Sequence, residues 1–179
     1  VGDLAVGASL DDDDSGTSGG YSYGGYNSDA GAVYILFLNA DGTVKAEQKI
    51  SSTQGGLTGP LEALDWFGNS VASLGDLDGD GVADLAVGAH WDDDGGNHRG
   101  AVYILFLNAD GTVKAEQKIS DTQGGLSATL DDDDHFGWSV ASLGDMDGDG
   151  VVDMVVGARK DDDGSTNGGA VYILFLNAD

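Results

Sequence analysis

The feature that most constrains the fold of this chain is an internal repeat with a period of 69 residues. The segment GAVYILFLNAD begins at Gly31, Gly100 and Gly169. Residues 31–57 match residues 100–126 at every position except one, where Ser52 corresponds to Asp121. Self-similarity at a fixed period indicates a repeat architecture, in which each unit packs on its neighbours along the chain.

One period predicts four β-strands and no helix. Residues 70–76 alternate small and apolar side chains, and residues 84–89 form a short apolar run typical of a strand covered on both faces. Residues 101–107 are rich in β-branched and aromatic residues and end at an NADG turn. Residues 112–119 alternate apolar and polar side chains, as in a strand with one face in water. Four antiparallel strands in each repeated unit predict the blade of a β-propeller.

These strands predict an all-β chain of ten strands, which is about two and a half propeller blades. We expect residues 1–66 to form strands two to four of a blade, with a Tyr- and Gly-rich insertion at 15–29. Residues 67–135 are expected to form a complete blade, and residues 136–179 the first three strands of another. The two partial blades together exceed one blade. We therefore interpret the chain as part of a longer repetitive protein, or as a protomer whose open blades are completed by neighbours.

The composition limits the partners of this chain. Its 32 acidic and 7 basic residues give a formal net charge of −25, which opposes compaction unless cations neutralise it. Nucleic acids and anionic membranes attract basic surfaces, so neither is an expected partner. No apolar run approaches the roughly 20 residues that span a bilayer, so direct membrane insertion is not expected. The absence of cysteine excludes disulfides, thiolate zinc sites and cysteine nucleophiles.

Many of the acidic residues lie in a loop with the composition of a calcium site. In the segment DLDGDGVAD, carboxylates occur at Asp76, Asp78, Asp80 and Asp84, and the glycines between them permit a tight turn. Calcium takes about six to eight hard oxygen ligands, whereas magnesium prefers a smaller octahedron and keeps its waters. The carbonyl of Val82 is well placed to be a further ligand. The EF-hand likeness is partial, because strands flank the loop, and the alternative interpretation is a solvated acidic turn.

The segments FGNSVASLGDLDGDGVADLAVGA and FGWSVASLGDMDGDGVVDMVVGA, each followed by GAVYIL, resemble the FG-GAP repeats of integrin alpha-subunit propellers and their bacterial relatives. The resemblance covers essentially the whole chain and implies a propeller, commonly of seven blades, with calcium bound between strands one and two. In the first unit only Asp3 matches, at the ninth loop position, so the site there is incomplete. The family's GAP proline is replaced by Ser9, His90 and Arg159. The ligands implied are Asp76, Asp78, Asp80, Asp84 and the Val82 carbonyl in one loop, and Asp145, Asp147, Asp149, Asp153 and the Val151 carbonyl in the other.

Four further acidic runs are predicted to lie away from the calcium loops. In an up-and-down blade, the loops after strands two and four emerge on the same face, which carries the partner-binding loops in the family that this chain resembles. One interpretation is a solvated acidic rim. The other is a set of secondary calcium sites, or a surface for cationic or calcium-bridged partners. The runs are Asp11–Asp14, Asp92–Asp94, Asp131–Asp134 and Asp161–Asp163.

The aromatic and histidine residues are expected in structural positions. Phe67 and Phe136 are predicted to pack between neighbouring blades, and the glycine after each to allow close backbone approach. The tryptophans are predicted at blade edges rather than in a sugar platform, and the histidines on the surface. The tyrosines of the insertion indicate a flexible loop, with a contact element or a glycan-carrying segment as alternatives. These residues are Trp66, Trp91 and Trp138, His90, His98 and His135, and Tyr21, Tyr23 and Tyr26.

The sequence favours a binding protein over an enzyme. It contains no nucleophile elbow, no histidine zinc pair and no phosphate-binding glycine loop. We expect an extracellular or cell-surface, calcium-binding protein used in adhesion or surface interaction, with a protein or glycan ligand at the acidic loop face. One alternative is a structural subunit of an extracellular filament that self-assembles through open blades. A less favoured alternative is a carbohydrate-binding lectin.

Overall fold

The structure is a computed structural model that describes residues 2–12, 29–164, 166 and 168–177. These residues form ten β-strands and no helix, as the sequence predicts. The tyrosines of the predicted insertion, and all of that insertion except Asp29, lie outside the described residues. Within the described part, no helix has the length and apolar character needed to cross a membrane.

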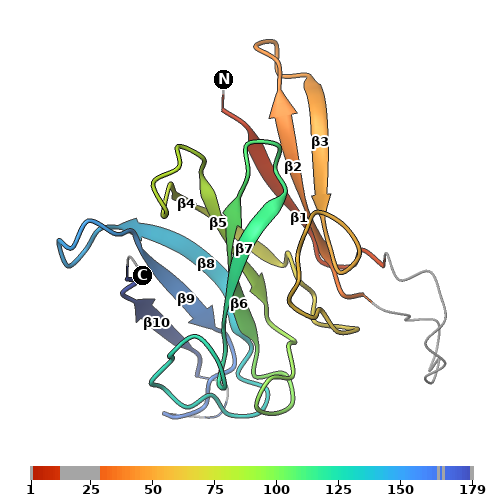
Figure 1. The fold of residues 1–179 in the computed structure, drawn as a ribbon. Coiled ribbons are helices and arrows are strands. Elements are labelled where there is room, and N and C mark those ends of the chain that lie inside the picture. The colour runs from red at the N-terminus through yellow and green to blue at the C-terminus, as the bar shows by residue number, and fades with distance from the viewer. Residues whose placement is uncertain (1, 13–28, 165, 167, 178–179) are drawn as a thin grey trace.

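The strands form three consecutive antiparallel sheets, which lie side by side with the four-stranded sheet in the middle (Figure 1). Sequence neighbours pair throughout, so each sheet is an up-and-down meander. The first sheet contains β1 (Leu4–Ala8), β2 (Ala32–Leu38) and β3 (Val44–Ile50). The second contains β4 (Ser70–Gly75), β5 (Asp84–Ala89), β6 (Ala101–Leu107) and β7 (Val113–Ile119). The third contains β8 (Phe136–Gly144), β9 (Asp153–Ala158) and β10 (Ala170–Leu174).

The middle sheet is covered on both faces by its neighbours. Every residue of β5 is buried, which explains its continuous apolar run. Along β6, Tyr103 and Leu105 pack with the first sheet, whereas Val102 and Ile104 pack with the third. Because side chains alternate across a strand, one sequence supplies both interfaces.

The two phenylalanines of the repeat lie at these interfaces. Phe67 and Phe136 are fully buried, in the first and second apolar cluster respectively. Each ring meets a tyrosine edge to face, Phe67 with Tyr103 at 5.4 Å and Phe136 with Tyr172 at 5.5 Å between centroids. The packing between neighbouring sheets predicted for these residues is therefore present.

Glycines allow the backbones of neighbouring sheets to meet. A Cβ atom at Gly88 in β5 would overlap the carbonyl oxygen of Gly137, and one at Gly7 in β1 would overlap that of Gly68. Gly68 and Gly137 themselves adopt φ values of 86° and 85°, in the left-handed region that glycine adopts at no steric cost. The Phe-Gly and Gly-Ala dipeptides of the repeat thus form one backbone contact between sheets.

The outer faces of the first and third sheets expose apolar side chains. In β1, Leu4 and Val6 are exposed, and in β10, Val171 and Ile173 are exposed. The residues at the same repeat positions of the middle sheet are buried against a neighbouring sheet. The outer faces therefore have the chemistry of faces that pack on a further blade.

Candidate metal centres

The loop between β4 and β5 folds around the carboxylate of Asp76. Its Oδ1 accepts hydrogen bonds from the backbone N–H groups of Gly79 at 2.7 Å and Asp80 at 3.0 Å. Its Oδ2 accepts from Gly81 N–H at 2.8 Å. Both glycines have positive φ, 79° and 90°, and an added Cβ would meet open space, so backbone conformation rather than crowding requires glycine here.

The loop between β8 and β9 repeats this arrangement. Asp145 Oδ1 accepts from Gly148 N–H at 2.6 Å, and its Oδ2 accepts from Gly150 N–H at 3.0 Å. The glycines have φ values of 84° and 93°. Two independent copies of the same backbone geometry follow from the same spacing of Asp and Gly.

Each loop brings three carboxylates together. In the first loop they belong to Asp76, Asp78 and Asp84, with one oxygen from each lying within 4.8 Å of the others. In the second loop, Asp145, Asp147 and Asp153 form the equivalent group. Carboxylate oxygens at this separation repel one another and suit a divalent cation with hard oxygen ligands. Each group could hold a metal ion.

Two of the sequence-predicted ligands lie outside these triads. The carboxylates of Asp80 and Asp149 each accept a hydrogen bond of 2.8 Å from the backbone N–H of the residue two positions on, Val82 or Val151. Asp78 and Asp147, which belong to the triads, accept the same kind of contact from the N–H groups of Asp80 and Asp149 at 3.3 and 3.1 Å, so this hydrogen bond does not explain the difference. The spacing alone did not indicate which of the loop carboxylates come together.

A lysine from β7 reaches the first loop. Lys114 Nζ lies 2.6 Å from Asp78 Oδ2 and also contacts Asp80. Hydrogen bonds to these two carboxylates raise the pKa of Lys114. The hydrogen bond from Lys114 to Asp80 in turn lowers the pKa of Asp80. The ammonium group neutralises part of the loop's charge, and a metal ion at Asp78 would share this carboxylate with it.

Asp84 combines a place in the triad with a structural role. The side chain is fully buried, and its Oδ1 and Oδ2 accept from the backbone N–H groups of Leu107 at 3.0 Å and Leu77 at 2.9 Å. Burial raises the pKa of Asp84. Asp3 keeps half of this role, since its Oδ1 accepts from Leu38 N–H at 2.9 Å, and within the described residues it belongs to no group of metal-binding side chains.

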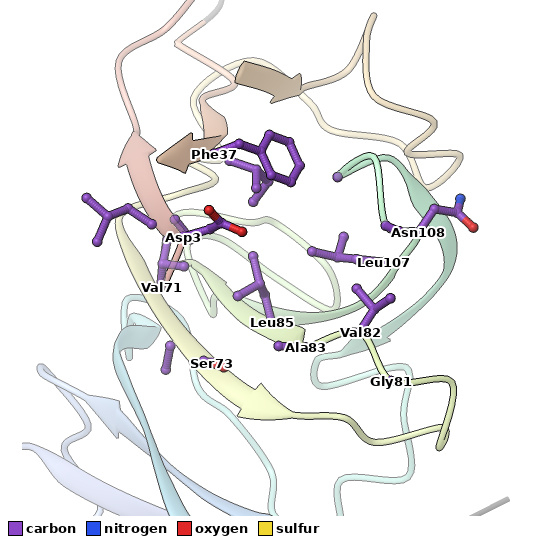
Figure 2. Close-up of a pocket in the computed structure, with 16 residues that line it drawn as sticks. Asp3, Phe37, Val71, Ser73, Gly81, Val82, Ala83, Leu85, Leu107 and Asn108 are labelled. Carbon is purple, nitrogen blue, oxygen red and sulfur yellow. The ribbon is translucent and has the colours of Figure 1, made fainter. Parts of the chain in front are cut away.

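The first loop also contributes to the packing between the first two sheets. A cavity of about 480 Å³ opens between β1, β2 and the middle sheet. Figure 2 shows Phe37, Leu85 and Leu107 around it, with Val82 from the acidic loop on the same wall. Val82 packs against the first apolar cluster, so order in the loop and packing between the sheets are physically connected.

The leading aspartate of each acidic run after the GA dipeptide is an internal ion or hydrogen-bond partner rather than part of a solvated rim. Asp92 is 2% exposed, and its Oδ2 accepts from Tyr103 Oη at 3.2 Å and pairs with Lys118 Nζ at 2.7 Å. Lys118 also pairs with Asp94 at 2.8 Å. In the first sheet, Asp11 makes the same contacts with Tyr34 and Lys49, and in the third, Asp161 accepts from Tyr172 at 2.6 Å. Asp13 and Asp14 lie outside the described residues.

The run that precedes β8 is tied to the middle sheet through an arginine. Arg99 Nε lies 3.0 Å from Asp132 Oδ1, and its Nη1 lies 2.8 Å from Asp121 Oδ2. Asp134 is buried and, like its repeat equivalent Asp65, has a raised pKa because of burial. For Asp65 the pKa reaches about 7, to which the negative charge of Asp92 also contributes.

The prediction that the histidines lie on the surface is wrong for two of the three. His90 is fully buried and His135 is 3% exposed. They lie at the junction of the second and third sheets with an aromatic group in which Trp91 stacks on Trp66 and His98, and Trp138 meets His90 edge to face. Burial lowers the pKa of His90 to about 3 and that of His135 to about 4, so both rings are neutral at pH 7.

The spacing of the histidines did not predict this junction, but a comparison of the repeats contains a signal for it. Each histidine stands where another repeat has a different residue, in segments that differ at several positions, whereas residues 31–57 and 100–126 differ at only one. His98 and His135 correspond to Asp29 and Trp66, and His90 corresponds to Arg159. The variable segments of the repeat therefore include the residues that meet at this junction.

Consecutive antiparallel meanders of three, four and three strands, each packed face to face on the next, are typical of a tandem-repeat protein of the β-propeller class. The FG-GAP repeat family matches residues 67–105 and residues 130–175, which contain the two acidic loops. The chain belongs to the FG-GAP repeat family.

Several known proteins similar to this chain are integrin alpha subunits. Integrin alpha-5 of Xenopus laevis is 35% identical over 156 residues, which are 87% of this chain and 13% of that protein. Integrin alpha-3 of Cricetulus griseus is 34% identical over 128 residues, 72% of this chain and 11% of that protein. Integrin alpha pat-2 of Caenorhabditis briggsae is 42% identical over 95 residues, 52% of this chain and 7% of that protein. The chain thus spans only a small part of the length of these curated relatives.

Proposed function

We propose that each of the two acidic loops binds one Ca²⁺ ion and that calcium stabilises the blades. The observation that carries this proposal is the pair of carboxylate triads, each with its oxygens within 4.8 Å and each held by hydrogen bonds from glycine N–H groups to the first aspartate of the loop. Calcium fits better than magnesium, because it accepts more oxygen ligands in a less regular geometry, whereas magnesium requires a small octahedron and keeps its waters. The proposed ligands are Asp76, Asp78, Asp80, Asp84 and the Val82 carbonyl, with Asp145, Asp147, Asp149, Asp153 and the Val151 carbonyl in the second loop.

The test is a calcium titration of the purified chain by calorimetry, together with thermal unfolding in calcium and in chelator. We expect two bound ions and a lower Tm after chelation, because the empty loops keep their carboxylate repulsion. The double variant Asp78→Ala, Asp147→Ala should lose most of this difference. Asp41→Asn with Asp110→Asn is the matched control, since it removes two charges from hairpin turns instead. A wild-type Tm that does not respond to chelation would overturn the assignment.

We further propose that this chain belongs to an extracellular or cell-surface protein that acts in adhesion, without enzymatic activity. The similarity to integrin alpha subunits supports this role, and millimolar external calcium would keep weak sites filled. A protein or glycan ligand would bind at the face formed by the loops after β5 and β7. Binding of immobilised chain to cells and to a glycan array, in calcium and in chelator, tests the proposal. If the chain binds neither cells nor glycans, in calcium or in chelator, the result would count against the proposal.

A second candidate is self-assembly, which the exposed apolar outer faces favour. We assign one complete blade to residues 67–135 and partial blades to residues 1–66 and 136–179. In an assembly, the outer face of each partial blade would pack on a similar blade of another copy. Covering Val171 and Ile173 by another copy would remove apolar surface from water. Light scattering and electron microscopy would detect the assembly, and Val171→Asp with Ile173→Asp should abolish it. A monomer at all concentrations tested excludes this candidate.

A further inference from the structure

A second type of metal-binding group lies at the junction of the second and third sheets, at the opposite ends of the strands from the acidic loops. It consists of His98, in the loop between β5 and β6, with Asp133 and His135, in the loop between β7 and β8. One ligand atom from each lies within 4.8 Å of the others. His98 Nδ1 is 3.2 Å from Asp133 Oδ1, and His135 Nε2 is 3.8 Å from the same oxygen.

The backbone holds these side chains together. His135 N–H donates to the carbonyl of His98 at 3.2 Å, and Asp133 N–H donates to the carbonyl of Asn97 at 2.8 Å. His98 and Asp133 are 35 residues apart in sequence, yet backbone hydrogen bonds join their two loops side by side. The positions of the three residues therefore do not depend on contacts between their side chains.

Buried imidazole nitrogens without partners mark the same place. His135 is 3% exposed, and its Nδ1 has no hydrogen-bond partner among the described residues. His90 is fully buried behind it, with 5.4 Å between the ring centroids, and neither of its nitrogens has a partner in the described part of the chain. An unsatisfied buried polar atom is uncommon in native proteins, because its desolvation is not offset by a hydrogen bond. Two such adjacent rings, of which His135 faces the Asp133 carboxylate with its other nitrogen, are unusual for a purely structural core.

The equivalent junction between the first and second sheets provides an internal comparison. Its backbone is the same, since Trp66 N–H donates to the carbonyl of Asp29 at 3.3 Å, as His135 does to His98. Leu64 and Trp66 have positive φ values of 75° and 56°, as Asp133 and His135 have values of 70° and 60°. The junction geometry thus accommodates side chains that bind no metal. The His, Asp, His set is particular to the second junction.

We propose that His98, Asp133 and His135 bind a divalent transition-metal ion, with Zn²⁺ as the best match. Two imidazoles and one carboxylate form a nitrogen-rich set that suits Zn²⁺ and disfavours Ca²⁺, which takes oxygen ligands. The site opens to solvent, since the side chains of His98 and Asp133 are 33% and 60% exposed. Water completes the tetrahedron at the open position. Because His98 lies in the loop between β5 and β6 and His135 directly precedes β8, the ion fastens the middle sheet to the segment that enters the third sheet.

Lys160 predicts a direction of change in metal affinity that a purely structural role of the histidines would not produce. Its Nζ lies 3.4 Å from His135 Nε2, the nitrogen that faces Asp133, so the ammonium group and the metal compete for this imidazole and repel each other. Removal of this positive charge should strengthen metal binding, whereas removal of a ligand should weaken it.

The experiment is a Zn²⁺ titration of the whole chain by calorimetry in excess calcium, which keeps the acidic loops occupied. We expect one bound Zn²⁺ per chain and a change in tryptophan fluorescence, because Trp91 stacks on His98 with 4.3 Å between centroids. The double variant Asp133→Leu, His135→Trp copies the residues of the first junction onto the same backbone, and should bind at least about tenfold more weakly. His98→Ala, at a half-exposed position, should weaken binding as well.

Two further variants separate this site from the calcium loops and from non-specific binding. Lys160→Met should bind Zn²⁺ more tightly than the wild type, and Asp78→Ala with Asp147→Ala should bind it equally well. Circular dichroism in chelator verifies that each variant is folded. The proposal is overturned if the wild type binds no Zn²⁺, or if Asp133→Leu, His135→Trp binds it with unchanged affinity.

Discussion

Asp84 Oδ1 accepts a hydrogen bond of 3.0 Å from the backbone N–H of Leu107, and so joins the start of β5 to the end of β6. The same contact recurs in the other sheets, from Leu38 to Asp3 and from Leu176 to Asp153. The last aspartate of the acidic loop is therefore a structural residue of the blade whether or not the loop holds a metal ion.

This dual role predicts different behaviour for two neighbouring aspartates. Asp84→Ala leaves the N–H groups of Leu107 and Leu77 without their partner, which costs about 1–3 kcal/mol for the buried N–H of Leu107 and less for the partly buried N–H of Leu77. The loss should appear in chelator as well as in calcium. Asp78→Ala should destabilise the chain only when calcium is present. Urea denaturation under both conditions measures the difference, and wild-type stability of Asp84→Ala in chelator would contradict it.

The contact between neighbouring backbones predicts a strong effect at Gly88. An alanine there places a Cβ against the carbonyl oxygen of Gly137 and the hydroxyl of Ser70, and the rigid backbone cannot move aside cheaply. We expect Gly88→Ala to destabilise the chain by about 3 kcal/mol. Gly164→Ala is the control, because its Cβ would meet open space. Equal melting temperatures for the two variants would exclude the proposed close contact.

The buried ion pair between Asp92 and Lys118 predicts a large loss of folding stability for Lys118→Met. Asp92 is 2% exposed and depends on Lys118 at 2.7 Å for its opposite charge. Removing one partner of a buried pair typically costs about 3–5 kcal/mol, because the other charge stays buried. The double variant Lys118→Met, Asp92→Asn should recover much of this stability. Chemical denaturation of both variants tests the coupling, and additive losses would argue against it.

Asp65 predicts a pH-dependent effect with a defined sign. Burial and the charge of Asp92 raise the pKa of Asp65 from 3.8 in the unfolded chain to about 7. The folded state therefore binds an extra proton between these two values, and the stability that this contributes is lost progressively as the pH rises from about 4 to about 7. Asparagine cannot ionise, and it keeps an acceptor for the N–H of Glu62. Relative to wild type, Asp65→Asn should gain about 2–3 kcal/mol between pH 5 and pH 8.

The comparison of this variant with wild type isolates Asp65, because every other titratable group is common to both chains. Asp110→Asn is the control. Its pKa is lowered by Thr112, so it is ionised in both states throughout the range. Denaturation curves at several pH values provide the measurement. A difference that falls with rising pH would show that Asp65 is stabilised as the charged form.

The sequence predicted the strands closely because the signals for them are local. The residues of β5 and β6 occupy the ranges that alternation and β-branched content indicate, and β4 and β7 each differ by one residue at an end. The third sheet differs more, since β8 begins at Phe136, three residues before the position equivalent to the start of β4. There Phe136 pairs with Ala158 across a bulge, a contact between strands that no local pattern specifies.

The closeness of Asp76, Asp78 and Asp84 was also accessible from sequence, because nine residues with two left-handed glycines can turn in few ways. The contact between Lys114 and the loop could not be predicted from sequence, and neither could the position of Asp80. Lys114 reaches the loop from β7, on the far side of the meander. Likewise, the acidic residue Asp92 is buried because Lys118 and Tyr103 lie beside it on other strands.

The sequence by itself determined the repeat, the strands, the family and the acidic loops, because each depends on residues close together in the chain. Only the tertiary structure decided which acids are buried and which histidines meet. His98 and His135 come together because the loops of two sheets run side by side when the apolar faces of those sheets pack. That packing depends on the summed burial of many side chains, and no short segment of the sequence contains it.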